Sequence, residues 1–135
     1  MTEDLKEKIT VLIVDDHPWV RRGLTDLFAQ TEDIEVVGIS KDGRDAVLKT
    51  IKHSPDVVLM DISMPYMDGI EACGFLLKAC PEARVVMLTS FPGKERVKQA
   101  LAAGAVGYLL KDTPPDELLR CVRSAAHHGI RVNDL

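Results

Sequence analysis

The stretch Ile9-Thr10-Val11-Leu12-Ile13-Val14-Asp15-Asp16 decides the fold, because it places two aspartates directly after a short apolar run. A second stretch of the same kind, Asp56-Val57-Val58-Leu59-Met60, is followed by Asp61. Apolar runs without alternation are typical of strands that are buried on both faces of a parallel sheet. Ligands bind at the carboxyl ends of the strands in such sheets. We therefore predict an α/β protein with three carboxylates gathered at one edge of its sheet.

The rest of the chain repeats this pattern. Apolar, β-branched runs alternate with segments in which apolar residues recur three and four positions apart, as in amphipathic helices. Five such pairs predict a flavodoxin-like (βα)5 fold, a doubly wound parallel five-stranded sheet with right-handed crossovers and helices on both faces. The predicted strands cover residues 9–14, 34–39, 56–60, 84–89 and 105–110.

Length and composition limit the function. A chain of 135 residues suits one domain, and its net charge of −4 argues against direct nucleic-acid binding, which needs a basic face. Three cysteines without a C-x-x-C pair argue against a disulfide framework and a zinc site. No run is long enough to span a membrane, and the polar residues 1–8 do not resemble a signal peptide. We expect a cytoplasmic protein that contacts no membrane.

Two further strand ends carry polar groups. Thr89 ends the fourth predicted strand and Lys111 follows the fifth, so a hydroxyl and an ammonium should join the three carboxylates. Carboxylates crowded together need a cation, and oxygen ligands favour a hard ion, with Mg²⁺ the first choice. This set suits phosphoryl transfer in which Asp61 is the nucleophile and Thr89 and Lys111 hold phosphoryl oxygens.

These residues resemble a known family, the response-regulator receiver domain of two-component signalling. The resemblance covers roughly residues 8–129. It rests on the polar strand ends together with two segments, Met60-Asp61-Ile62-Ser63-Met64-Pro65-Tyr66-Met67-Asp68-Gly69 and Gly104-Ala105-Val106-Gly107-Tyr108-Leu109-Leu110-Lys111. It implies that Asp61 is the phosphoacceptor, and that Mg²⁺ is bound directly by Asp61 and Asp16, through water by Asp15, and by the backbone carbonyl of Ser63.

The resemblance also implies a switch and its partners. Thr89 would move to the phosphoryl group while Tyr108 rotates inward, changing the surface around the fourth helix, the fifth strand and the fifth helix. The donor would be a sensor histidine kinase or a small phosphodonor, and phosphorylation could drive formation of a homodimer. Such a domain catalyses its own phosphorylation and dephosphorylation but is not a turnover enzyme.

Two segments, residues 15–24 and 109–112, resemble receivers of the NarL/LuxR class, in which a helix-turn-helix DNA-binding domain follows a linker. We therefore expect a polar extension over residues 1–8, a receiver domain over 9–129, and over 130–135 the start of a linker to a missing output domain. That domain would bind DNA and control transcription. A stand-alone receiver and a phosphorylation-independent interaction module remain alternatives.

Other α/β functions fit less well. A phosphatase of the haloacid-dehalogenase type needs a second acid two residues after its nucleophile, where Ser63 stands. A dinucleotide-binding domain needs a glycine-rich turn after the first strand, where Asp15-Asp16-His17-Pro18 stands. His17 lies beside the predicted acidic pocket and could tune it. The pairing of Ser63 with Phe91 offers no group to orient a hydrolytic water, which predicts a long-lived phosphoryl group.

Overall fold

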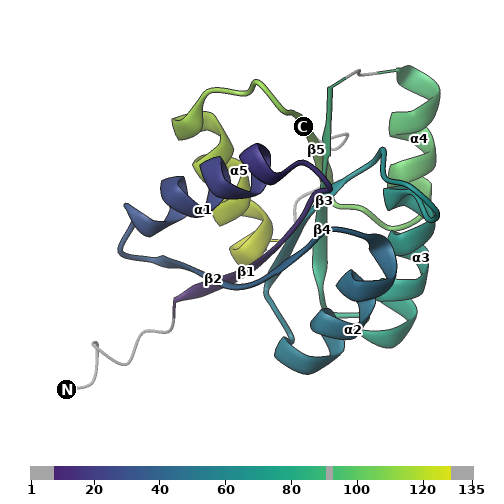
Figure 1. The fold of residues 1–135 in the computed structure, drawn as a ribbon, viewed down its shortest axis with the longest axis horizontal. Coiled ribbons are helices and arrows are strands. Elements are labelled where there is room, and N and C mark those ends of the chain that lie inside the picture. Colours follow the sequence, from purple (N-terminus) through teal and green to yellow (C-terminus); the bar gives the residue numbers. More distant parts are fainter. Residues whose placement is uncertain (1–7, 91–92, 129–135) are drawn as a thin grey trace.

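Five parallel strands form one sheet in the part of the chain that the structure, a computed structural model, describes, residues 8–90 and 93–128 (Figure 1). The order across the sheet is β2-β1-β3-β4-β5. The strands are β1 (Ile9–Val14), β2 (Ile34–Ser40), β3 (Val57–Asp61), β4 (Arg84–Thr89) and β5 (Gly107–Leu110). Phe91, the predicted linker over 130–135 and nearly all of the predicted N-terminal extension lie outside the described residues.

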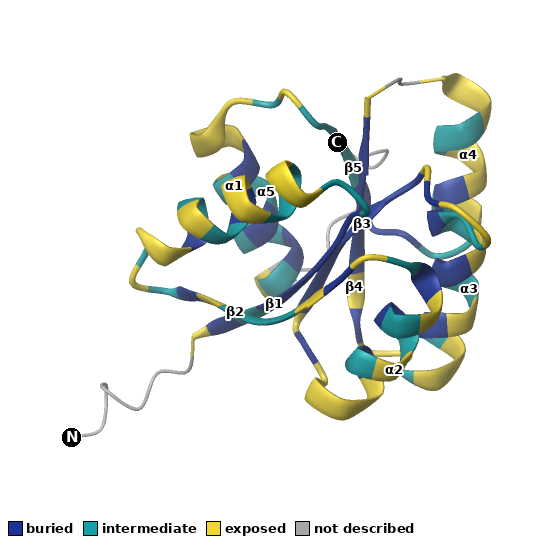
Figure 2. Ribbon diagram, in the orientation of Figure 1, coloured by how far each residue is buried: buried dark blue, intermediate teal, exposed yellow. Residues whose placement is uncertain are grey.

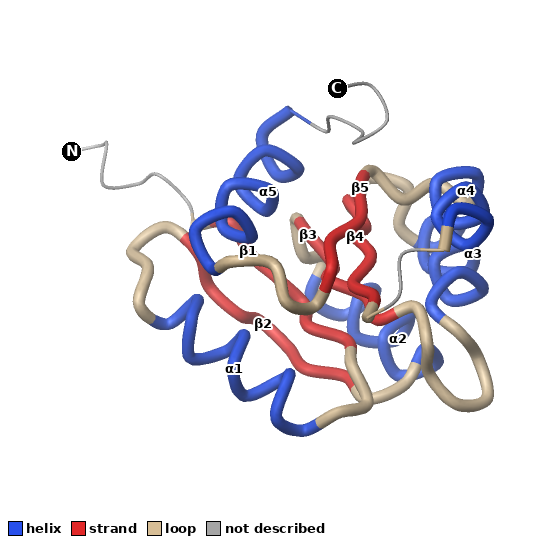
Figure 3. Tube along the Cα trace, turned by 90° about the horizontal axis from the view of Figure 1, so that it is seen from above, coloured by secondary structure: helices blue, strands red, loops and turns tan. Residues whose placement is uncertain are grey.

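Helices cover both faces of the sheet (Figures 1 and 3). One face carries α1 (Pro18–Ala29) and α5 (Pro115–His128). The other carries α2 (Gly43–His53), α3 (Gly69–Ala79) and α4 (Lys94–Ala102). This arrangement confirms the predicted flavodoxin-like fold. No helix among the described residues is both long enough and apolar enough to cross a membrane.

The two faces of the central strands fill two separate cores. In β1, Leu12 and Val14 pack toward α2, α3 and α4, whereas Val11 and Ile13 pack toward α1 and α5. All four side chains are fully buried, and Figure 2 shows the same burial along β3 and most of β4, whereas the edge strand β2 is only partly buried. Burying such a side chain contributes about 1.5–3 kcal/mol, so the unbroken apolar runs of the sequence supply much of the stability.

Two strands, β3 and β5, start later than predicted, and β2 and β3 each end one residue later than predicted. Asp56 lies one residue before β3, where its N–H donates to the Thr10 carbonyl at 2.9 Å and its carboxylate accepts from the N–H and the hydroxyl of Thr10, at 2.9 and 3.2 Å. Ala105 belongs to the turn that caps α4, since its N–H donates to the Ala100 carbonyl, and Gly104 before it has a φ of 113°. A glycine accepts this left-handed conformation without strain, so the helix can end there and β5 begins at Gly107.

Candidate functional site

The polar groups predicted at the strand ends meet at the carboxyl edge of the sheet. Asp15 follows β1, Asp61 ends β3, Thr89 ends β4, and Lys111 follows β5. These four strands are neighbours in the sheet, and the Lys111 N–H donates to the Thr89 carbonyl at 2.9 Å. Asp15, Asp61 and Thr89 are each at most 5 % exposed. The sheet order therefore brings into one buried cluster groups that lie up to 96 positions apart in the sequence.

Lys111 links the two buried carboxylates. Its Nζ lies 2.9 Å from Oδ2 of Asp15 and 3.2 Å from Oδ2 of Asp61. Burial alone would lower the pKa of Lys111, but the hydrogen bond and charge of Asp15 and the charge of Asp61 outweigh it, so this pKa lies above its usual value. The ammonium therefore stays charged and holds both carboxylates against the end of β5.

The single ammonium of Lys111 does not balance the negative charge of the carboxylates in this cluster. Burial, followed by the charge of Asp15, raises the pKa of Asp61 to about 6, although Lys111 and the Ser63 N–H act in the opposite direction. That N–H donates to Oδ1 of Asp61 at 3.1 Å. The role of the Ser63 backbone carbonyl as a metal ligand stays a prediction. Burial and the neighbouring carboxylate thus disfavour the ionised form of Asp61, and a cation bound beside it would favour that form.

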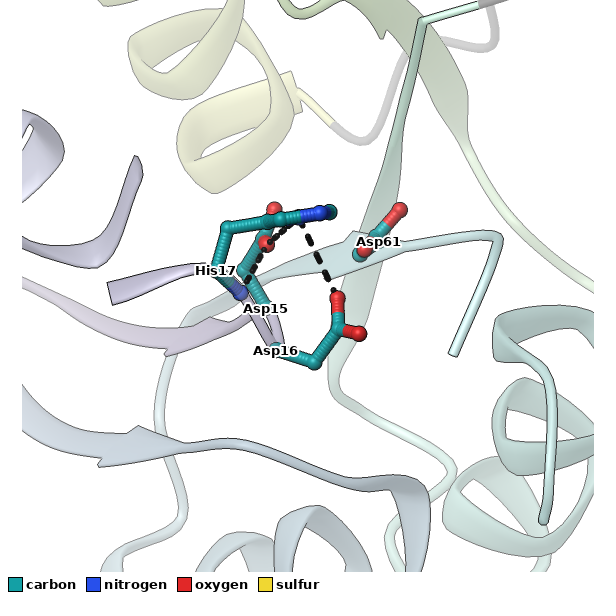
Figure 4. A group of neighbouring side chains, drawn as sticks. All are labelled: Asp15, Asp16, His17 and Asp61. Atoms are coloured by element: carbon teal, nitrogen blue, oxygen red, sulfur yellow. Dashed lines mark hydrogen bonds and ion pairs between the residues drawn. The ribbon is translucent and has the colours of Figure 1, made fainter. Parts of the chain in front are cut away.

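The remaining acidic oxygens point toward the same space (Figure 4). One ligand atom each from Asp15, Asp16, His17 and Asp61 lies within 4.8 Å of all the others. One buried oxygen of each of the three aspartates has its close contact with Lys111 or His17 only, as an ion pair, among the described residues. Buried carboxylate oxygens gathered in this way fit a divalent cation that prefers oxygen ligands.

The loop after Asp61 is held by a glycine. The Gly69 N–H donates to the Ile62 carbonyl at 2.7 Å, and a Cβ at Gly69 would overlap the Asp61 carbonyl oxygen. Asp68 caps α3 by accepting from the Glu71 N–H at 2.8 Å. The sequence segment from Met60 to Gly69 includes the pair Asp68-Gly69, for which the sequence alone predicted no role. The structure shows that this pair seats α3 directly against the end of β3.

Sequence reasoning also missed Arg21, whose Nη1 donates to the Asp15 carbonyl at 2.7 Å. The signal was available, because residue 21 stands four positions after His17 and so shares its face of the helix. This contact fixes the backbone at the Asp15-Asp16 pair.

The two predicted switch residues lie on the same face of the sheet. Thr89 pairs with Leu110, and Met87 with Tyr108, so Thr89 and Tyr108 are on adjacent strands, offset by two residues. Tyr108 is half-buried and packs with Met87 against the core under α2, α3 and α4. This placement allows a movement of the Thr89 side chain to reach Tyr108, although their role as a switch stays a prediction.

Comparison with known proteins identifies the family. The sequence profile of the response regulator receiver domain matches residues 11–123. The chain belongs to the response regulator receiver domain family. Its role is that of a receiver in two-component signalling, and the family is not one of turnover enzymes.

Relatives and solved structures agree on the class. The receiver domain is 44 % identical over 121 residues to the transcriptional regulatory protein YxjL of Bacillus subtilis, which covers 90 % of this chain and 56 % of YxjL. The signal receiver domain of the putative response regulator NarL from Mycobacterium tuberculosis matches with a TM-score of 0.85 and 34 % identity, over 90 % of this chain and 98 % of that one.

A LuxR-family response regulator from Aurantimonas matches with a TM-score of 0.87 and 31 % identity, covering 93 % of this chain and 89 % of that one. These matches confirm the predicted resemblance to the NarL/LuxR class. The receiver domain spans about half the length of the curated relatives it matches.

Proposed function

We propose that this receiver domain accepts a phosphoryl group on Asp61 from a sensor histidine kinase, with Mg²⁺ bound beside it, and so controls transcription by a longer protein. The observation that carries the proposal is the setting of Asp61. It is a buried carboxylate at a strand end, 3.2 Å from the Lys111 ammonium and beside a second buried carboxylate, Asp15.

The transfer needs an ionised Asp61. A carboxylate oxygen forms a bond to phosphorus while the bond from phosphorus to the donor's imidazole nitrogen breaks, and that nitrogen keeps the electron pair. In the product, Lys111 holds a phosphoryl oxygen as it now holds the Asp61 carboxylate. The Thr89 hydroxyl, at the end of the adjacent strand, holds another.

Asp15, Asp16 and Asp61 would hold Mg²⁺, together with the backbone carbonyl of Ser63. Their carboxylate oxygens lie close together at one edge of the sheet, and oxygen is the donor that Mg²⁺ prefers, which supports this assignment. When bound, Mg²⁺ supplies the positive charge that shields the carboxylates from the incoming anion and contacts a phosphoryl oxygen.

The signal leaves the site through the sheet. A phosphoryl group adds nearly two negative charges and three acceptor oxygens at the end of β3. Thr89 moves toward these oxygens, and Tyr108, on the same face of the neighbouring strand, rotates into the space beside it. The surface around α4, β5 and α5 then changes, which favours a homodimer and alters a DNA-binding domain elsewhere in the longer protein.

The test is the intact mass of the protein after incubation with acetyl phosphate, in Mg²⁺ and in EDTA. We expect one phosphoryl adduct that requires Mg²⁺, is absent in Asp61→Asn and persists in the control Asp33→Asn, since Asp33 lies on the surface away from the site. An adduct on Asp61→Asn would refute the assignment of the nucleophile. A folded protein that binds Mg²⁺ but accepts no phosphoryl group, even from a phosphorylated histidine kinase, would favour a phosphorylation-independent interaction module.

A further inference from the structure

His17 brings an imidazole nitrogen into the group of carboxylates (Figure 4). Its backbone N–H donates to Oδ1 of Asp15 at 2.9 Å, and its ring packs 4.8 Å from the ring of Trp19. Pro18 follows it and restricts its backbone to an extended conformation, which the φ of −96° and ψ of 117° show. The backbone thus aims this side chain at the acidic cluster, while 42 % of the side chain stays exposed.

The contacts of the ring match the spacing of ligands around an ion. Nδ1 of His17 lies 3.1 Å from Oδ1 of Asp15 and 3.2 Å from Oδ1 of Asp16. Two neighbouring ligands of an octahedral ion with bonds of about 2.1 Å lie about 3.0 Å apart, and two opposite ligands about 4.2 Å apart. The four donors here lie within 4.8 Å of one another. A contraction of about half an ångström would bring these four donors to octahedral spacing, with two positions left for other ligands.

A nitrogen donor changes which ion the cluster prefers. Mg²⁺ takes oxygen ligands and keeps several waters, so it gains little from an imidazole. First-row transition ions such as Ni²⁺ bind imidazole readily. With Mg²⁺, Nδ1 of His17 can remain a hydrogen-bond donor to Asp15 or Asp16. With Ni²⁺, the neutral ring can turn its Nδ1 lone pair to the ion and carry its proton on Nε2.

We infer that His17 is a metal-selectivity residue. Its Nδ1 joins Asp15, Asp16 and Asp61 as a ligand for divalent transition ions, so the receiver domain binds these ions in preference to Mg²⁺. This inference rests on the proposed function, because it uses the same metal site. It adds to that function a class of ion that competes for the site and a residue that sets the order of preference.

The experiment is isothermal titration calorimetry of the whole chain with Mg²⁺ alone and with Ni²⁺ alone. The variants are His17→Ala and His17→Asn, and the second keeps a residue type that is favoured at the N-cap of α1. His53→Asn is the matched control, since His53 is an exposed histidine at the far end of α2. Unfolding in urea without metal checks that every variant is folded.

Both His17 variants should lose affinity for Ni²⁺ by at least about tenfold, since even partners that only orient a ligand are worth roughly 10–100-fold. Their affinity for Mg²⁺ should stay close to that of the wild type, and His53→Asn should change neither. Equal losses for the two ions, or an unchanged Ni²⁺ affinity, would overturn the role of His17 while leaving the Mg²⁺ site in place. A wild-type protein that binds no Mg²⁺ would overturn the proposed metal site, and this inference with it.

Discussion

Replacing Asp61 by asparagine should stabilise the metal-free protein at neutral pH. The ordinary carboxyl pKa is 3.8, and burial with the charge of Asp15 raises that of Asp61 to about 6 in the folded state. Between these two pH values the folded protein binds more protons than the unfolded chain. Its free energy of unfolding therefore falls as the pH rises through this window, and the loss is complete above about pH 6.

The magnitude follows from the two pKa values. The difference between 3.8 and about 6, at about 1.4 kcal/mol for each pH unit, sets an upper limit of roughly 3 kcal/mol. Water reaches this edge of the sheet beside Asp16 and His17, whose side chains are 30 % and 42 % exposed, and screening reduces the effect. We expect Asp61→Asn to gain about 1–2 kcal/mol over the wild type at pH 7 and little at pH 4.

The assay is urea unfolding followed by far-ultraviolet circular dichroism, in EDTA, at intervals from pH 4 to pH 8. The wild type should lose stability relative to Asp61→Asn up to about pH 6 and then run parallel to it. Mg²⁺ should close the gap, because an ion that binds only the folded wild type stabilises it by mass action. A difference that does not change with pH, or a wild type that is more stable than the variant in EDTA at pH 7, would refute the reasoning.

Asp33 provides a control with the opposite sign. Its hydrogen bond to Arg123, which outweighs the effect of burial, holds the pKa of Asp33 below its usual value. The stability that this group contributes is present above the unfolded pKa and is lost as the pH falls through the lower folded value. The advantage of the wild type over Asp33→Asn should therefore stay constant above the ordinary pKa of 3.8 and shrink only below it. The advantage of Asp61→Asn over the wild type has the opposite sign and should shrink at higher pH, between about 6 and 3.8.

Three further changes test the structure. Gly69→Ala should lower stability by about 2 kcal/mol or more, because a Cβ would overlap the Asp61 carbonyl oxygen, and an unchanged urea midpoint would contradict this. Lys111→Ala should lower the free energy of unfolding by about 3 kcal/mol in EDTA, because it leaves Asp61 without its ammonium partner. The variant should still bind Mg²⁺ in calorimetry and recover stability when Mg²⁺ is present. Loss of Mg²⁺ binding would count against this. Arg123→Ala removes a surface pair with Asp33 and should lower stability by less than about 1 kcal/mol. A large fall in the melting temperature would contradict this.

The sheet could be predicted from the sequence because its signals are local. The start of each strand was placed within two residues of its observed position, since runs of Val, Ile and Leu do not need knowledge of their neighbours. The errors came from contacts between elements. Asp56 was predicted as a strand residue but lies just before β3, where its carboxylate accepts a hydrogen bond from Thr10, 46 positions away in the sequence.

The members of the site could also be predicted, but their contacts could not. The rule that parallel strands end at one edge places Asp15, Asp61, Thr89 and Lys111 along the same edge of the sheet. They form one cluster because the strands that carry them are neighbours in the observed order. The rule does not say that Lys111 contacts both carboxylates, or that the Asp15 carbonyl is held by Arg21. These contacts depend on side-chain reach across neighbouring strands, which spacing along the chain does not encode.

The sequence by itself determined the fold, the edge of the sheet at which the site forms, and the residue types that meet there, because hydrophobic periodicity and strand polarity are properties of the chain. Only the tertiary structure decided how charged the site is and which groups share it. The pKa of Asp61 depends on burial and on the distance to Asp15. The position of His17 depends on the path of the chain between the end of β1 and the start of α1. Electrostatic energies vary with distance and with the surrounding medium, and both are set only when the strands and helices have packed.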